Sequence, residues 1–293
     1  MSPLSDSPIV VGVDGSAPAA AALAWAARRA KITGARVHIL HAFAVDLPML
    51  GFGEVEDRDS IRQYAASLVT AATARVHSLA PGARVTTSVA RGFASPALIA
   101  ASHDAQAVVV GTTGQGTLSK ISLGPVAMQV ATHAACPIVL VADEMSAPTD
   151  PPRVVVGVDG SEASLRALDK AVEQAGVLGA TLEVVHAWQA RSVNDPNLSA
   201  GSNWADYEGR VTSLVTDRVA RAPRPAALAN TDRPVPAVEL VRGDPVKVLA
   251  ERSKGAAEII VGCRGAGGFP GLHLGTVALG LLGRARCPLM LIH

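Results

Sequence analysis

The strongest constraint on the fold of this chain is that its sequence repeats. Residues 8–42 match residues 153–187, and both segments contain VVGVDGS, separated by 145 residues. A second block, residues 91–142, matches residues 242–293 at a separation of 151 residues. Two matches of this length in the same order indicate a duplicated domain. The fold must therefore be built twice, each time from about half of the 293 residues.

Each copy alternates short apolar runs with helical patterns. In the first copy the Val- and Ile-rich runs predict strands at 8–13, 36–41, 85–89, 107–111 and 137–142. The segments between them predict helices at about 17–33, 57–79, 94–103 and 124–134. Strands that are apolar almost throughout suit parallel strands covered on both faces. We therefore predict an α/β fold of two tandem, Rossmann-like domains, each a doubly wound parallel sheet of five strands.

The joint between the copies is polar and rich in proline. It reads DEMSAPTDPP at 143–152, a composition typical of a linker. We predict domains at 1–145 and 153–293 with a linker at 146–152. Gly34 and Gly179 are predicted to end the first helix of each copy.

Composition excludes several classes of protein. The formal net charge is only +1, from 26 basic and 25 acidic residues, which argues against a nucleic-acid-binding surface. The sequence has no run of eighteen or more apolar residues, so no membrane span is expected, and no secretory signal is visible. The three cysteines show no C-x-x-C spacing. We expect a cytoplasmic protein that binds neither nucleic acid nor membranes.

The glycine-rich loop after the fourth strand carries most of the functional information. In the second copy it runs from Gly262 to Val277. Glycines let backbone N–H groups approach an anion closely, and a helix beginning near Gly275 and Thr276 directs its free N–H groups to the same place. The alternative is a surface loop followed by an ordinary helix start. No G-x-x-x-x-G-K-[ST] motif is present, so the chain is not a P-loop NTPase.

The glycine spacing in this loop is G-x₂-G-x₉-G-[ST], formed by Gly262, Gly265, Gly275 and Thr276. With VGVDGS opening each copy, V-H-A at the second strand and Cys-Pro before the last strand, the chain resembles the universal stress protein family, specifically its tandem, ATP-binding members. The resemblance implies that ATP is the ligand, with Mg²⁺ left open. It also implies that the acidic residue after the first strand, Asp14 or Asp159, lies beside the adenine and ribose.

The predicted site combines three segments of each copy. Strands one and four are expected to be neighbours whose connections leave in opposite directions, and open α/β sheets bind ligands at that point. The resemblance also places backbone at the end of the second strand against the base. The predicted residues of the second copy are Gly157, Val158, Asp159, Ala187, Gly262, Cys263, Arg264, Gly265, Ala266, Gly267, Gly268, Gly275, Thr276 and Val277. Those of the first are Gly12, Val13, Asp14, Ala42, Gly111, Thr112, Thr113, Gly114, Gln115, Gly116, Thr117, Gly124 and Pro125. For the two aspartates the alternative is a cap or turn residue in D-G-S.

The two loops are not equivalent. Pro125 stands where the second copy has Thr276, and Thr113 stands where it has Arg264. Proline fits the first turn of a helix but offers neither a hydroxyl nor an N–H. Losing up to two hydrogen bonds to charged groups would weaken phosphate binding by roughly 10²–10⁴. We therefore predict that the first copy binds ATP more weakly, or binds something smaller, although Lys120 offers a compensating charge.

Other candidate residues have plainer interpretations. His41 and His186 end matching apolar strands and are expected to pack or cap rather than catalyse. Cys136 and Cys287 are expected to be buried thiols. Cys263 lies in the loop, where a redox-sensitive thiol is the alternative to a space-filling side chain.

Three functions remain open on the sequence. The first is a binding module that passes its ATP-bound state to an unknown protein partner or to its own oligomerisation. The second is a slow ATPase or phosphoryl-transfer enzyme, for which the loop shows no evident base and no pair of metal-binding carboxylates. The third is a structural role without a ligand. Family members commonly pair through the last strand, so we expect the two copies to pack about a pseudo-twofold axis and the chain to form a homodimer.

Overall fold

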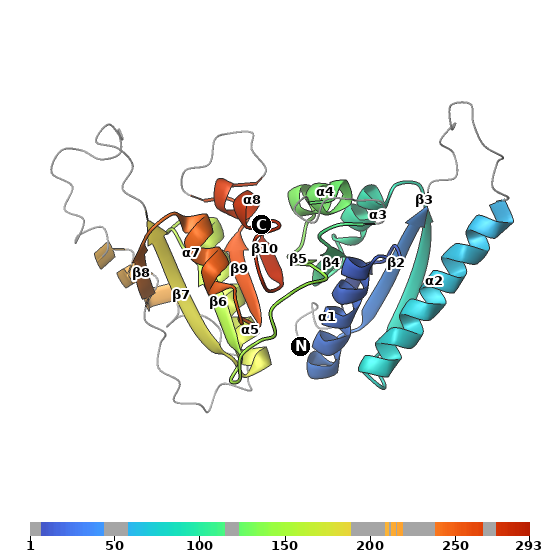
Figure 1. Ribbon diagram of the computed structural model, residues 1–293, viewed down its shortest axis with the longest axis horizontal. Helices are drawn as coiled ribbons and strands as arrows, with labels where there is room; N and C mark the ends of the chain where they lie inside the picture. The colour runs from blue at the N-terminus through green and yellow to red at the C-terminus, as the bar shows by residue number, and fades with distance from the viewer. Residues whose placement is uncertain are drawn as a thin grey trace. The chain divides into compact units, whose positions relative to one another are not determined.

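The computed structural model describes eight stretches of the chain and divides it into two compact units, Met1–Asp143 and Glu144–His293 (Figure 1). The described residues are 7–43, 58–114, 123–188, 209–210, 212–214, 216–218, 238–265 and 274–293. Within these stretches no helix is both long and apolar enough to cross a membrane.

In its described residues, the first unit is a parallel five-stranded sheet with four helices. Its strands are β1 (Ile9–Gly12), β2 (Val37–Phe43), β3 (Val85–Arg91), β4 (Ala107–Gly111) and β5 (Ile138–Val141). Its helices are α1 (Ala17–Thr33), α2 (Arg58–Leu79), α3 (Ala94–Ala101) and α4 (Pro125–His133). The strand order is β3-β2-β1-β4-β5, and every neighbouring pair is parallel. These elements match the predicted ones closely.

The second unit repeats this order. Its strands are β6 (Arg153–Gly157), β7 (Thr181–Trp188), β8 (Val238–Arg242), β9 (Glu258–Gly262) and β10 (Leu289–Ile292). Its main helices are α5 (Glu162–Leu178), α7 (Pro245–Arg252) and α8 (Thr276–Leu281). The strands lie in the order β8-β7-β6-β9-β10, again all parallel. The predicted fold of two tandem doubly wound domains is confirmed.

The connections decide which helices cover which face of the sheet. In the first unit α1 packs against α2, and α3 packs against α4. The chain steps from β1 towards β3, then returns to β4 and steps on to β5. Because parallel connections are right-handed, the two helix pairs cover opposite faces. Strands β1, β4 and β5 are buried at nearly every position, whereas β3, at the edge of the sheet, has no buried residue.

The first helix of each unit begins and ends as its sequence predicts. The side chain of Ser16 accepts a hydrogen bond from the backbone N–H of Ala19, and Ser161 does the same for Ser164. Gly34 and Gly179 end these helices with φ of 71° and 61°, a conformation that favours glycine. The two starts matter for function because each lies directly after a candidate aspartate.

The segment between the repeats is bonded to the second unit. Ser146 donates its N–H to Arg286 O at 2.8 Å, and Thr149 donates to Gly255 O at 2.8 Å. The domain limits of 1–145 and 153–293, with a linker at 146–152, stay a prediction.

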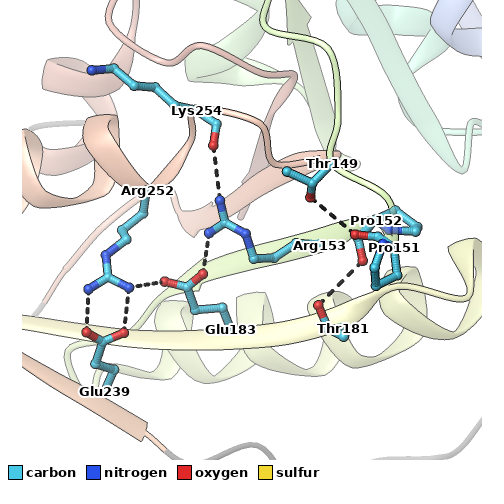
Figure 2. A network of polar contacts seen from close by, with 9 residues as sticks. All are labelled: Thr149, Pro151, Pro152, Arg153, Thr181, Glu183, Glu239, Arg252 and Lys254. Carbon is cyan, nitrogen blue, oxygen red and sulfur yellow. Dashed lines mark hydrogen bonds and ion pairs between the residues drawn. The ribbon is translucent and has the colours of Figure 1, made fainter.

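The second unit also carries a network of charged side chains (Figure 2). It lies near the starts of the strands, whereas the glycine loop leaves the end of β9 at Gly262. Arg252, at the end of α7, reaches Glu183 on β7 at 2.7 Å and pairs with Glu239 on β8. Arg153 pairs with the other oxygen of Glu183 and donates to Lys254 O at 3.0 Å. The network ties three neighbouring strands to one helix.

Candidate functional site

The predicted site residues lie where the chain changes direction in each sheet. β1 and β4 are neighbours, and so are β6 and β9. The chain leaves β1 towards β2 but leaves β4 towards β5, so loops diverge from the carboxyl ends of this pair. Such a point is where open α/β sheets bind ligands.

The first unit has a cavity of about 230 Å³ at this point. Ten of its lining residues were predicted from the sequence. They are Gly12, Val13, Asp14, Ala42, Gly111, Thr112, Thr113, Gly114, Gly124 and Pro125. Three further predicted residues, Gln115, Gly116 and Thr117, lie outside the described residues, as does Lys120. The structure therefore brings the strand ends and both ends of the loop together.

Sequence reasoning missed the apolar floor of this cavity. The missed lining residues are Ala19, Leu40, Ala94, Leu98, Val110, Val126 and Ala127. A Cβ on Gly12 would lie 3.1 Å from Leu98 Cδ1, and one on Gly157 would lie 2.8 Å from Leu249 Cδ1. A signal was present, because Leu98 and Leu249 hold matching places in the second repeat block. A leucine from the helix after the third strand fills the space that glycine leaves.

The aspartate after the first strand has a structural role in both units. Asp14 Oδ1 accepts hydrogen bonds from Ser16 N at 2.9 Å and Ser16 Oγ at 2.6 Å. Asp159 Oδ1 accepts the same pair from Ser161 at 3.0 and 2.6 Å. The carboxylate thus orients the serine that caps the helix, which is the turn role considered as the alternative.

The second oxygen of each aspartate faces the glycine loop. A Cβ built on Gly114 would lie 2.7 Å from Asp14 Oδ2, and one on Gly265 would lie 2.5 Å from Asp159 Oδ2. Real Cβ atoms do not come this close, so a side chain at either position would require the carboxylate to shift. Strand end and loop are therefore in direct contact in both units.

A backbone hydrogen bond closes the base of each loop. Gly124 N–H donates to Thr112 O at 2.8 Å, and Gly275 N–H donates to Cys263 O at 2.6 Å. Neither α4 nor α8, which start at the next residue, has a side-chain cap. The first N–H groups of a helix have no partner within the helix, so both loops end on backbone donors.

The glycine that ends the fourth strand is required by packing. A Cβ on Gly111 would lie 2.7 Å from the backbone carbon of Pro18, and one on Gly262 would lie 2.8 Å from that of Ala163. The start of the loop therefore packs closely against the first turn of the first helix, which the capping serine directly precedes.

The matching histidines are structural. His41 Nδ1 lies 2.8 Å from Val13 O, and His186 Nδ1 lies 2.7 Å from Val158 O. A carbonyl only accepts, so Nδ1 carries the proton and donates. Both rings are buried. Each one holds the backbone immediately before the aspartate, in agreement with the interpretation that they pack or cap.

The loop thiol is buried and protonated. Cys263 is 2% exposed. Burial raises its pKa to about 12, although Arg264 and Arg166 act to lower it. Burial also raises the pKa of Cys136 to about 11 and that of Cys287 further. Since the thiolate is the reactive form, the geometry favours a space-filling role for Cys263 over a redox-sensitive one.

In the second unit the predicted residues occupy the equivalent places. Gly157 ends β6 and is followed by Val158 and Asp159, Ala187 lies in β7, and the loop leaves β9 at Gly262. Thr276 and Val277 begin α8. The predicted loop residues Ala266, Gly267 and Gly268 lie outside the described residues, as does His273.

The charge at the two loops differs. Arg264 is exposed. Burial lowers the pKa of His293, and the positive charge of Arg264 lowers it further. Thr113, its counterpart in the first unit, has no charge. In the part of the chain that the structure describes, no group of three or more His, Cys, Asp or Glu side chains is arranged to hold a metal ion.

Comparison with known proteins gives a consistent result over both units. A model of the universal stress protein family matches residues 7–142 and 152–293. A universal stress protein of Mycolicibacterium smegmatis is 32% identical, over 97% of this chain and 96% of its own. Another, from Mycobacterium tuberculosis, is 30% identical over 96% of this chain and 95% of its own. The crystal structure of a universal stress protein from Archaeoglobus fulgidus shares the fold with a TM-score of 0.68 at 21% identity, covering 98% of this chain and 96% of that one.

Proposed function

This chain belongs to the universal stress protein family, and on that premise we propose that it is an ATP-binding regulatory protein whose second unit is the stronger ATP site. The observation that carries the proposal is the contact between aspartate and glycine loop at the switch point of each sheet. Asp14 meets Gly114 and Asp159 meets Gly265 in the same geometry. A duplicated arrangement with glycine at both contacts supports a shared ligand-binding purpose.

The chemistry of these segments fits the parts of ATP. The cavity floor around Leu40 and Leu98 is apolar, which suits a purine ring. A carboxylate such as Asp14 accepts hydrogen bonds from ribose hydroxyls or an exocyclic amine and repels phosphate. The phosphates then belong at the loop and at the start of the following helix, where backbone N–H groups donate.

Two differences support stronger ATP binding by the second unit. Thr276 offers a hydroxyl and an N–H where Pro125 offers neither. Arg264 offers a positive charge where Thr113 offers none. Hydrogen bonds to charged groups are the strong ones, so these changes favour a triphosphate in the second unit.

A reciprocal pair of substitutions in the full chain tests this proposal. Thr276→Pro should weaken the tightest ATP binding by about 10²-fold, since it removes up to two donors. Pro125→Thr should leave that binding unchanged and strengthen a second, weaker event. Titration calorimetry measures both. ATP binding that Thr276→Pro leaves unaltered would overturn the assignment, and no binding by the unsubstituted chain would overturn the proposal itself.

The same preparation separates a binding module from an enzyme. The proposal expects ATP turnover below about one per second, a low rate for an enzyme. Mass spectrometry of denatured protein identifies any nucleotide carried through purification. Faster turnover would favour the phosphoryl-transfer alternative. A homodimer, an unknown protein partner and a cytoplasmic location also stay predictions.

A further inference from the structure

We propose that the cavity of the first unit binds an uncharged purine nucleoside of the adenosine type more tightly than it binds a nucleotide. The inference rests on the proposed function only in taking the switch-point cavity as a nucleoside site. It differs from weak ATP binding, because it assigns this cavity a ligand that lacks phosphate altogether.

The charge of the cavity wall favours a neutral ligand. Asp14 is the one charged residue among the described residues that line it. A triphosphate placed there would face a carboxylate, with no cation in the described wall to offset the repulsion. At the matching position of the second unit the loop carries the positive charge of Arg264 where the first has Thr113. A nucleoside avoids the repulsion and supplies hydroxyl donors that a carboxylate accepts.

The size of the cavity points in the same direction. Pockets for drug-sized ligands are roughly 300–1,000 Å³. The cavity here is about 230 Å³, with mostly apolar and glycine walls. Pro125 is the first residue of α4, so the first N–H that a helix would offer to a phosphate is absent there. A small, flat and largely apolar ligand fits these limits better than an extended, highly charged one.

An exposed aromatic residue directly precedes a lining residue of the cavity in the chain, which is a second difference between the units. Phe93 directly precedes Ala94, a lining residue, and 63% of Phe93 is exposed. It is the N-cap residue of α3, yet it makes no side-chain cap. The matching Asp244 caps α7 by accepting from Lys247 N at 2.9 Å. The first unit thus has an exposed ring where its counterpart has a stabilising cap.

An exposed phenylalanine that is next in the chain to a lining residue of a small apolar cavity suits the binding of a nucleoside. Bases stack on phenylalanine side chains, and this stacking accounts for a substantial part of base affinity. Exchanging a helix cap for an exposed ring weakens the fold slightly, so the exchange calls for a gain elsewhere. Base stacking at the cavity supplies that gain.

Photolabelling and titration of the full chain test the inference together. Irradiation with 8-azidoadenosine followed by peptide mapping should label the first unit, and unlabelled adenosine should compete. Calorimetry should find one adenosine site per chain. Phe93→Ala should weaken adenosine binding by about 5- to 100-fold, the range expected for loss of one base–aromatic stack, and leave ATP binding unchanged.

Ile32→Ala is the matched control. Ile32 is similarly exposed, at 54%, but lies at the far end of α1, about 20 Å from the cavity residue Ala19 by helical rise. It should change neither affinity. Labelling confined to the second unit, or ATP binding to the first unit as tightly as adenosine, would overturn the inference.

The outcomes for the two proposals are distinguishable. Adenosine labelling of the first unit without ATP binding anywhere supports this inference and defeats the proposed function. ATP binding to the second unit without adenosine binding to the first does the reverse. A Phe93→Ala chain that binds adenosine as well as the unsubstituted chain overturns the role of the ring.

Discussion

The two units share their backbone geometry and differ in their side-chain chemistry. In both, an aspartate orients a capping serine, a histidine holds the preceding carbonyl, and glycines stand where no Cβ fits. The differences fall on the surfaces that a ligand would meet. They are Phe93 against Asp244, Thr112 against Cys263, Thr113 against Arg264 and Pro125 against Thr276. The residues that hold the fold together are therefore the same in both units, whereas several residues at the loops and helix starts around the candidate sites differ.

A second difference lies at the opposite ends of the strands. The first unit has His38, which contacts Thr86 Oγ1 at 2.9 Å and Ser88 Oγ at 2.8 Å. The second has Glu183 at the matching position, within the arginine network of Figure 2. Both arrangements join the same neighbouring strands, one with neutral hydrogen bonds and the other with ion pairs. The position requires a cross-strand polar link but no particular charge.

The largest expected effect is a low rate of alkylation of the loop thiol. It tests whether Cys263 makes the second loop chemically more reactive than the first, which has Thr112 at the matching position. A pKa of about 12 leaves roughly 10³-fold less thiolate at pH 8 than an ordinary thiol has. Alkylation of native Cys263 by iodoacetamide should be slower than in denatured protein by a similar factor. Peptide mass spectrometry after timed quenching measures both rates.

The same raised pKa has a consequence for stability. Folding favours the neutral thiol, so its contribution is complete below pH of about 8.5 and is lost as the pH rises towards 12. Rapid alkylation of native Cys263 would contradict the space-filling interpretation and make the two loops chemically distinct.

The next effect concerns a feature that the units share. Gly111→Ala and Gly262→Ala place a Cβ within 3 Å of the backbone of the first helix, as the distances of 2.7 and 2.8 Å indicate. Each should destabilise its own unit by about 1–3 kcal/mol, the usual cost of overpacking. Hydrogen exchange with mass spectrometry assigns the loss to a unit, since two units need not unfold together.

Gly124→Ala is the control, because its Cβ would meet only ordinary contacts at 3.5 Å or more. It should be tolerated. A Gly262→Ala chain as stable as the original would show that the loop start is not fixed by packing.

A substitution in the charged network should have a smaller effect on stability. Its dependence on salt should distinguish the second unit from the first. Arg252→Ala leaves two partly exposed carboxylates without their shared partner and should cost about 1 kcal/mol at low salt. About 1 M salt should reduce this loss. Urea unfolding at both salt concentrations measures it. Lys254→Ala, which breaks only an exposed pair with Glu251, is the control and should have almost no effect.

His38→Ala sharpens the same comparison in the first unit. Loss of two neutral hydrogen bonds should cost about 1 kcal/mol and be nearly independent of salt. Burial and then Arg36 lower the pKa of His38. The contribution of the neutral ring is therefore present above pH of about 6.5 and lost as the pH falls below it. If the stability losses of His38→Ala and Arg252→Ala depended equally on salt, the distinction between neutral hydrogen bonds in the first unit and ion pairs in the second would be wrong.

The smallest effect tests the exchange of a cap for an aromatic ring. Asp244→Ala should destabilise the second unit by about 0.5–1 kcal/mol through loss of the bond to Lys247 N. Phe93→Asp should stabilise the first unit by up to a similar amount. Thermal unfolding followed by unit-resolved hydrogen exchange measures both. A Phe93→Asp chain that loses stability would mean that Phe93 supports the fold, against the role proposed for it.

The sequence predicted much of the site because its signals are local. The D-G-S turns, the glycine spacing and the Cys-Pro before the last strand are read over a few residues. That Asp14 and the glycine loop belong to one site needed only the order of the strands, which right-handed connections restrict strongly. Leu98 was missed because its partner, Gly12, lies 86 residues earlier in the chain. The contact depends on how α3 settles on the sheet.

By itself, the sequence determined the duplication, the alternation of strand and helix, the helix caps at Gly34 and Gly179, and the inequality of the two loops. The duplication follows from the matching segments. The alternation and the caps follow from periodicity and turn chemistry, which act within about one helical turn. The tertiary structure alone decided that the aspartates face loop glycines, that His41 and His186 hold strand ends, and that Arg252 joins Glu183 to Glu239. Each of these contacts joins residues from different strands or helices, and strand register together with helix packing, rather than local preference, sets which side chains meet.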